Sequence, residues 1–119
     1  PDFDGDTDSN EGLAAEISTL EYILLTAIQA YAVNNTGAPI GYDPQEYPYF
    51  FGDVNQNGVY DVDEGAYESW TPRLIRAAYN YQWTQIDPGA YAHNGLYIIQ
   101  VLYDSIGDLG VDVSVYTRP

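Results

Sequence analysis

The sequence has 119 residues with 18 acidic side chains, three arginines and no lysine, and its formal net charge at pH 7 is −15. This acidic excess argues against binding to nucleic acids or to anionic membrane surfaces, because both depend on Lys and Arg. The absence of Cys excludes disulfides, thiolate metal sites and covalently attached c-type haem. A hydrophobic content of 45% in a chain of this length predicts a single domain over 1–119 with its own core.

The first segment, residues 1–12, carries carboxylates at alternate positions, as loops do when they direct oxygen atoms at a calcium ion. No twelve-residue register from Asp2 or Asp4 ends on an acidic residue. We therefore expect Glu11 or Glu16 to complete the oxygen shell. The alternative is an acidic segment placed before a helix, where carboxylates interact favourably with the helix dipole. The predicted ligands of this calcium site are Asp2, Asp4, Asp6, Asp8, Glu11 and Glu16.

Residues 11–33 are predicted to form the first helix, because apolar side chains recur at steps of three and four residues. Ser9 or Asn10 is expected to cap its start. The sequence 34–37, which ends in Gly37, is expected to terminate it and also contains a glycosylation sequon at Asn34. The predicted buried stripe consists of Leu13, Ile17, Leu20, Leu24, Ile28 and Tyr31.

Residues 37–52 contain three prolines and no helical period. Most of their large side chains are aromatic. We expect this segment to lie across the helices as an ordered aromatic loop with short edge-strand pieces, since Pro is tolerated at sheet edges.

Residues 53–64 match a twelve-residue EF-hand-type calcium loop. Gly58 stands at position 6, where such a loop turns sharply, and Glu64 stands at position 12, where a bidentate carboxylate is needed. Calcium prefers six to eight oxygen ligands, and the alternating register supplies them. The alternative is a solvated acidic turn. The predicted ligands are Asp53, Asn55, Asn57, the carbonyl of Val59, Asp61 and Glu64.

Two more helices are predicted, over 72–85 and 95–108. Thr71 is expected to cap the first of them, with Pro72 at its first position, and Asn94 to cap the second. The expected core residues are Leu74, Ile75, Ala78, Tyr81 and Ile86 in one helix, and Leu96, Ile99, Leu102 and Ile106 in the other.

The tail 111–117 alternates apolar and polar residues and is rich in β-branched side chains, which predicts a strand. Its backbone groups need partners. These would come either from the aromatic segment 38–51 or from another subunit, and strand addition to a neighbour is one way to polymerise. The predicted fold is therefore mainly α: a three-helix bundle with EF-hand-like calcium loops, an aromatic Pro-rich loop and a C-terminal strand.

Enzymatic activity is not predicted. His93 is the single histidine and precedes an expected helix start, where a hydrogen-bonded turn residue is the more common role. No serine stands in a nucleophile elbow and no glycine loop opens a helix. The paired carboxylates are assigned to calcium, which leaves none for acid–base chemistry. Arg73 and Arg76 are expected to pair with carboxylates.

A resemblance to a known family is carried by six blocks, namely 4–12, 27–31, 47–51, 70–82, 87–94 and 102–106. Through these blocks the chain is similar to the C-terminal, haem-free region of large secreted multihaem c-type cytochromes from anaerobic environmental microbes, over nearly its whole length to about residue 109. The resemblance implies an extracellular location and a calcium loop at 53–64. Haem-attachment motifs are absent, so the resemblance does not imply a haem in this chain.

Two functions are compatible with these features. One is an extracellular, calcium-stabilised structural protein that self-assembles into filaments or another surface polymer through its C-terminal strand. Its 13 tyrosines suit such a surface, and bound calcium would reduce the repulsion between acidic side chains. The other is a haem-free accessory or docking domain partnered with a multihaem cytochrome. A calcium sensor is the third alternative. No run approaches membrane-spanning length, so membrane insertion is not expected.

Overall fold

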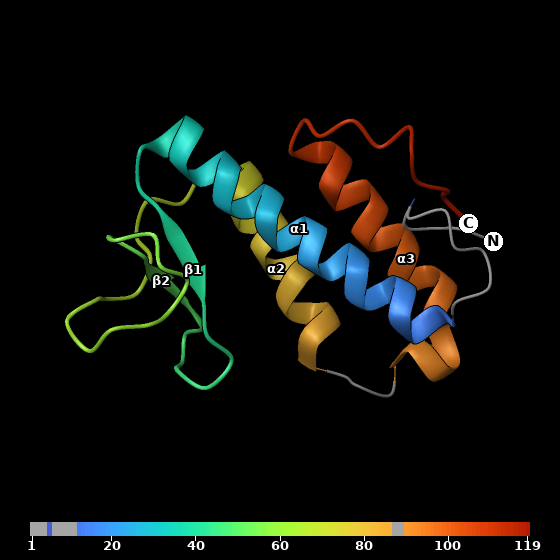
Figure 1. The fold of residues 1–119 in the computed structure, drawn as a ribbon, viewed down its shortest axis with the longest axis horizontal. Coiled ribbons are helices and arrows are strands. Elements are labelled where there is room, and N and C mark those ends of the chain that lie inside the picture. Colours follow the sequence, from blue (N-terminus) through green and yellow to red (C-terminus); the bar gives the residue numbers. More distant parts are fainter. Residues whose placement is uncertain (1–4, 6–11, 87–89) are drawn as a thin grey trace.

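The computed structural model describes Gly5, residues 12–86 and residues 90–119, without the side chains of Leu13, Ile86 and residues 90–94. The fold is mainly α, as predicted. In Figure 1, α1 crosses α2 and α3, the two strands and their loops lie at one end, and the chain terminates near the other. The elements in chain order are α1 (Leu13–Thr36), β1 (Ile40–Tyr42), β2 (Phe50–Gly52), α2 (Pro72–Ile86) and α3 (Ala90–Asp108).

Helix α1 buries the predicted stripe from Ile17 to Ile28, whereas Tyr31 is only partly buried and the side chain of Leu13 is not described. Leu20, Leu24 and Ile28 are completely buried against the other two helices. The helix ends at Gly37, which adopts a left-handed conformation with φ 71° and donates its N–H to the Val33 carbonyl at 3.2 Å. Glycine adopts that conformation without steric cost, so the predicted stop is confirmed. The N-cap is Gly12, which makes no side-chain hydrogen bond, and the expected caps at 9 and 10 lie outside the described residues.

Helix α2 begins as predicted, with the Leu74 N–H donating to Thr71 Oγ1 at 3.1 Å and Pro72 at the first position. Helix α3 begins at Ala90, five residues before the predicted start. The prediction that Asn94 caps this helix was therefore wrong, because Asn94 lies inside it.

Two residues that were predicted to lie in the core of α2 and α3 are exposed. Ile75 and Leu96 are each 49% exposed, so assigning them to the core was wrong. A helix that contacts only two neighbours buries a limited arc, and both residues lie outside that arc. The burial predicted for the other described core residues of the two helices is confirmed, and Ala77 and Ile98 are buried with them. The confirmed residues are Leu74, Ala78, Tyr81, Ile99, Leu102 and Ile106.

Strands β1 and β2 form an antiparallel hairpin in which Gly41 pairs with Phe51, which confirms the expected strand pieces. The outer edge of β2 is covered by the segment that follows the predicted calcium loop. The Gly52 N–H donates to the Gly65 carbonyl at 2.9 Å, and the Tyr67 N–H donates to the Phe50 carbonyl at 3.0 Å. The sheet therefore brings the two ends of the loop side by side.

The C-terminal segment forms no strand, and the prediction for 111–117 was wrong for this chain on its own. The Tyr116 N–H donates to the Val113 carbonyl at 3.0 Å in a turn, and both side chains pack against the helical core. Arg118 then pairs with Asp104 of α3 at 2.9 Å. The hairpin lies at the opposite end of the molecule (Figure 1), so no sheet edge is near this segment.

Candidate calcium-binding loop

The predicted calcium loop, residues 53–64, leaves β2 directly and is closed by the sheet. Gly52 and Gly65 are hydrogen-bonded to each other, and Tyr60 packs edge-on against Phe51 with ring centroids 5.5 Å apart. The Asp53 N–H also donates to the Pro39 carbonyl at 3.1 Å. A strand therefore takes the place of the entering helix that an EF-hand has.

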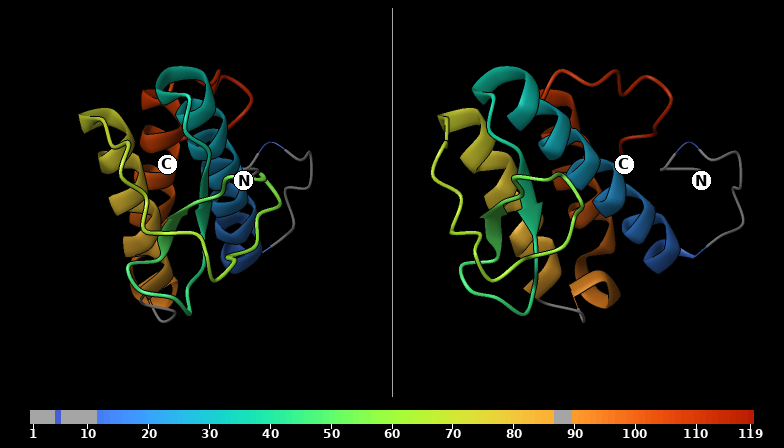
Figure 2. Two further views of the ribbon diagram at one scale, coloured as in Figure 1. Left: turned by 90° about the vertical axis from the view of Figure 1, so that its left-hand side faces the viewer. Right: turned by 60° about the vertical axis from the view of Figure 1, so that its left-hand side comes forward.

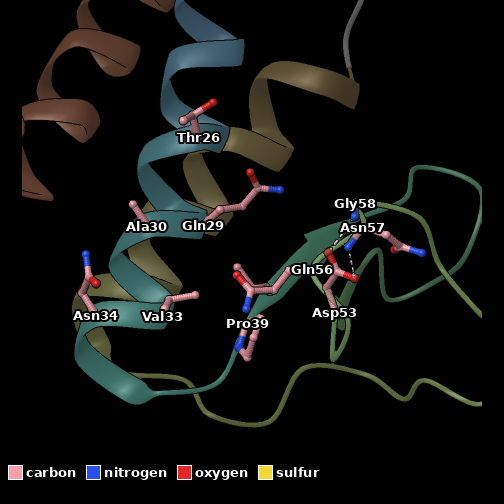
Figure 3. Close-up of a pocket in the computed structure, with 11 residues that line it drawn as sticks. Thr26, Gln29, Ala30, Val33, Asn34, Pro39, Asp53, Gln56, Asn57 and Gly58 are labelled. Carbon is pink, nitrogen blue, oxygen red and sulfur yellow. Dashed lines mark hydrogen bonds between the residues drawn. The ribbon is translucent and has the colours of Figure 1, made fainter.

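Asp53, at position 1, is buried and folds over the turn. Its Oδ2 accepts the Gly58 N–H at 2.8 Å, and its Oδ1 accepts the Asn57 N–H at 3.2 Å (Figure 3). Gly58 has φ 75°, which confirms the sharp turn predicted at position 6. A carboxylate has about four lone-pair sites, so these bonds leave Asp53 further capacity to bind a cation.

Glu64, at position 12, is also buried and links the two arms of the loop. Its Oε1 accepts the Asp61 N–H at 2.8 Å, and its Oε2 accepts the Val54 N–H at 3.0 Å. The closing carboxylate thus connects residues near the two ends of the loop.

Three further predicted ligands converge within the loop. The amide groups of Asn55 and Asn57 donate to Asp61 Oδ2 at 3.2 and 3.5 Å. Oxygens of carboxylates and side-chain amides are the ligands that calcium prefers. The donor types therefore fit this ion.

The carboxylates of the loop are not gathered around a single point. Among the residues that the structure describes, no three acidic or histidine side chains form a cluster able to hold a metal ion. Asp53 and Glu64 accept backbone N–H groups instead, and Asp61 accepts the side-chain amides of Asn55 and Asn57. The calcium site consequently stays a prediction.

The second predicted calcium site lies mostly outside the described residues, which exclude Asp2, Asp4, Asp6, Asp8 and Glu11. Of its proposed ligands only Glu16 is described, and its side chain is fully buried in the first turn of α1. Gly5 packs against the C-terminal segment, because a Cβ at Gly5 would lie 2.7 Å from the Val115 carbonyl oxygen.

A groove of about 550 Å³ separates the calcium loop from α1 (Figure 3). One wall comes from the C-terminal half of α1, with Gln29, Val33 and the sequon residue Asn34. The other wall comes from Asp53 and from residues 56–58 of the loop. A change in the loop would therefore alter the surface that it shares with α1.

The three arginines all lie away from the loop. Arg73 and Arg76 share the carboxylate of Asp108, at 3.9 and 3.3 Å, which confirms the expected pairing. Arg118 pairs with Asp104. All three arginines thus pair with carboxylates of α3, and none of their ion pairs involves a carboxylate of the loop.

A polar cluster that the sequence did not reveal surrounds Glu21 of α1. Thr84 and Gln85 donate to its carboxylate. Burial raises the pKa of Glu21, and the Thr84 hydrogen bond opposes that shift. Burial likewise raises the pKa values of Tyr42 and Tyr81, which face it from β1 and α2. Only the packing of these elements encloses Glu21, so no local pattern could have identified it.

Comparison with known proteins found similarity to polyhaem cytochromes. The chain is 32% identical over 108 residues to the C-type polyheme cytochrome OmcC of Geobacter sulfurreducens (strain PCA), covering 81% of this chain and 13% of that protein. It is 35% identical over 72 residues to OmcB from two strains of the same species, covering 50% of this chain and 10% of OmcB. The chain thus spans about a tenth of the length of these relatives.

The comparisons support the resemblance to polyhaem cytochromes that the sequence indicated. No family model matches the chain, and no solved structure matches it. Among the described residues, no helix has the length and apolar character needed to cross a membrane. The single histidine, His93, belongs to α3, and its side chain lies outside the described part.

Proposed function

We propose that this chain is a calcium-stabilised, haem-free docking module of an extracellular multihaem-cytochrome electron-transfer system. The observation that carries the proposal is the 32% identity to a polyheme cytochrome over 81% of a chain that contains no cysteine. A segment that cannot attach a c-type haem covalently would contribute to electron transfer by positioning a haem-bearing partner.

Calcium would stabilise the half of the module that contains the hairpin and the loop 53–64. Asp53 and Glu64 are buried, at 3% and 8% exposure, and their described partners are backbone N–H groups. Buried carboxylates without a counter-charge are costly. A bound divalent ion would supply that charge and would lower the repulsion within a chain of net charge −15.

Two measurements test the proposal. Calorimetric titration of the chelator-treated chain with calcium should show heat of binding. A column carrying the chain should retain a purified OmcC-type cytochrome in calcium, detected by haem absorbance. The double variant Asp53→Asn, Glu64→Gln should lose both signals, whereas Asp63→Asn, at a position that is not a predicted ligand, should keep them. Absence of calcium binding would refute the calcium part of the proposal. Cytochrome that passes through the column unretained would refute the docking part.

Self-assembly into a surface polymer is a second candidate function, and a different surface now supports it. The C-terminal strand on which it first rested is not formed. Helix α2, however, carries two of the three basic residues and no acidic residue in a strongly acidic chain. That distribution favours a contact between unlike surfaces of two copies.

A further inference from the structure

The outer face of α2 differs from the rest of the surface. Arg73 and Arg76 are 53% and 58% exposed at their side chains. Ile75 and Tyr79 are exposed beside them, at 49% and 71%. Tyr and Arg are the residues most enriched where protein partners bind tightly. The face is also shallowly concave, since Ile75, Arg76, Tyr79 and Asn80 line a depression of about 330 Å³.

The charge of this face is locally positive. Arg73 and Arg76 share the single carboxylate of Asp108, so about one positive charge is left over. An acidic partner surface would be attracted to this face, whereas a neutral or basic surface would not.

The turn between β1 and β2 presents the complementary group. Tyr47, at the tip of this turn, is 84% exposed, which is the largest exposed fraction among the described aromatic residues. Glu46 is exposed next to it, and Asp43 lies at the start of the turn. Residues 43–68 contain seven acidic residues and no basic one, namely Asp43, Glu46, Asp53, Asp61, Asp63, Glu64 and Glu68.

The turn is ordered before any partner binds. The Tyr49 N–H donates to the Glu46 carbonyl at 2.7 Å, and the Gln45 N–H donates to Asp43 Oδ1 at 2.9 Å. The rings of Tyr47 and Tyr49 meet edge-on, with centroids 5.5 Å apart. A tip that is already fixed loses little conformational entropy on binding, which favours its use as an anchor.

We infer that the Tyr47 turn of one copy docks on the α2 face of a second copy. The Tyr47 ring enters the depression beside Ile75 and Tyr79, and Glu46 approaches Arg76. The turn projects from the sheet (Figure 2), so the two surfaces are distinct and the contact is head-to-tail. Such a contact leads to rings or open filaments. The inference rests on the self-assembly candidate and not on the cytochrome-docking proposal.

Sedimentation velocity over a range of concentrations, in excess calcium, tests the contact. The wild-type chain should form a concentration-dependent series of oligomers that weakens at high salt, because exposed charges are screened. Tyr47→Ala and Tyr79→Ala should each weaken association roughly tenfold or more, as loss of an interface anchor does. Tyr22→Ala is the matched control. Tyr22 is 72% exposed on α1, and its loss should leave association unchanged.

A pair of charge-reversal variants distinguishes the proposed contact from nonspecific association. Glu46→Arg and Arg76→Glu should each abolish association, and an equimolar mixture of the two variants should restore it. Circular dichroism should show unchanged helicity in all variants. A chain that stays monomeric at every concentration overturns the inference, as does a mixture that fails to recover. Binding of a polyhaem cytochrome to the α2 face of a monomeric chain would also overturn it, and would assign the face to that partner.

Discussion

The helical and hairpin halves of the molecule are stabilised by different interactions. In the helical half, α1, α2 and α3 meet along aliphatic stripes, and Leu20, Leu24 and Leu102 are fully buried there. In the other half, the hairpin and the loop 53–64 are ordered by backbone pairing, aromatic edge contacts and carboxylates that accept N–H groups. The hydrophobic effect stabilises the helical half. The hairpin half instead contains buried carboxylates, which a bound cation would stabilise.

In this very acidic chain, the main aliphatic core and the densest group of acidic residues lie in different halves of the molecule. Two of the three arginines lie on α2 and the third lies in the C-terminal segment, and all three pair with carboxylates of α3. The segment 43–68, by contrast, contains seven acidic residues and no basic one. Stability should therefore respond to apolar truncation in one half and to ions in the other.

Truncating the helical core should have the largest effect. Leu102→Ala removes a side chain that is 0% exposed and should lower the free energy of unfolding by about 2–5 kcal/mol. The loss should be the same with and without calcium, as measured by urea unfolding. Leu96→Ala, on the same helix but 49% exposed, should lose far less. Equal losses at the two positions would contradict the packing described for α3.

Calcium should stabilise the chain through the loop half. An ion present at about a hundred times its Kd adds roughly 2.7 kcal/mol to the free energy of unfolding if only the folded state binds it. Asp53→Asn should remove most of that gain, and Asp63→Asn should retain it. Parallel urea titrations in calcium and in chelator measure the difference. A gain that survives Asp53→Asn would place the ion elsewhere.

The Tyr67 hydroxyl connects the hairpin half to the end of α1. The Tyr67 hydroxyl donates to the Ala38 carbonyl at 2.7 Å and lies 2.9 Å from Thr36 Oγ1. Tyr67→Phe leaves these buried acceptors with fewer donors and should lower stability by about 1–2 kcal/mol. Thermal unfolding measures the change. Tyr22→Phe, at an exposed position on α1, should be neutral, and a loss of similar size there would show that the effect is not specific to the junction.

The Glu21 cluster should give the smallest effect, and one that depends on pH. Burial raises the folded-state pKa of Glu21 above the ordinary value of 4.5. The stabilising contribution of Glu21 to the free energy of unfolding is therefore fully present below pH 4.5. It is lost as pH rises through the folded pKa. Glu21→Gln should therefore match the wild type near pH 4 and exceed it at pH 7, by no more than about 1 kcal/mol after solvent screening.

Differential unfolding of the two proteins across pH checks this expectation, because the other carboxylates titrate equally in both. The groups facing Glu21 are Tyr42 from β1 and Tyr81 from α2, and burial raises the pKa of both phenols further. Neither should ionise in the range examined. A difference that is constant from pH 4 to pH 7 would exclude Glu21 as its source.

Much of this protein follows from local sequence. The stripe of α1, its stop at Gly37, the start of α2 at Thr71 and Pro72, and the sharp turn at Gly58 were all predicted and are present. Each depends on backbone geometry and on neighbours within a few residues, which a linear pattern records directly.

Other features were decided by the tertiary structure. The segment 111–117 has the alternation of a strand but lies far from any sheet edge, so it turns and packs on the helices instead. Ile75 has the apolar character of a core residue but faces outward, and Glu21 is enclosed only when α2 and β1 pack over it. Local pattern shows which surfaces a chain offers, but which of them are covered depends on contacts between residues distant in sequence.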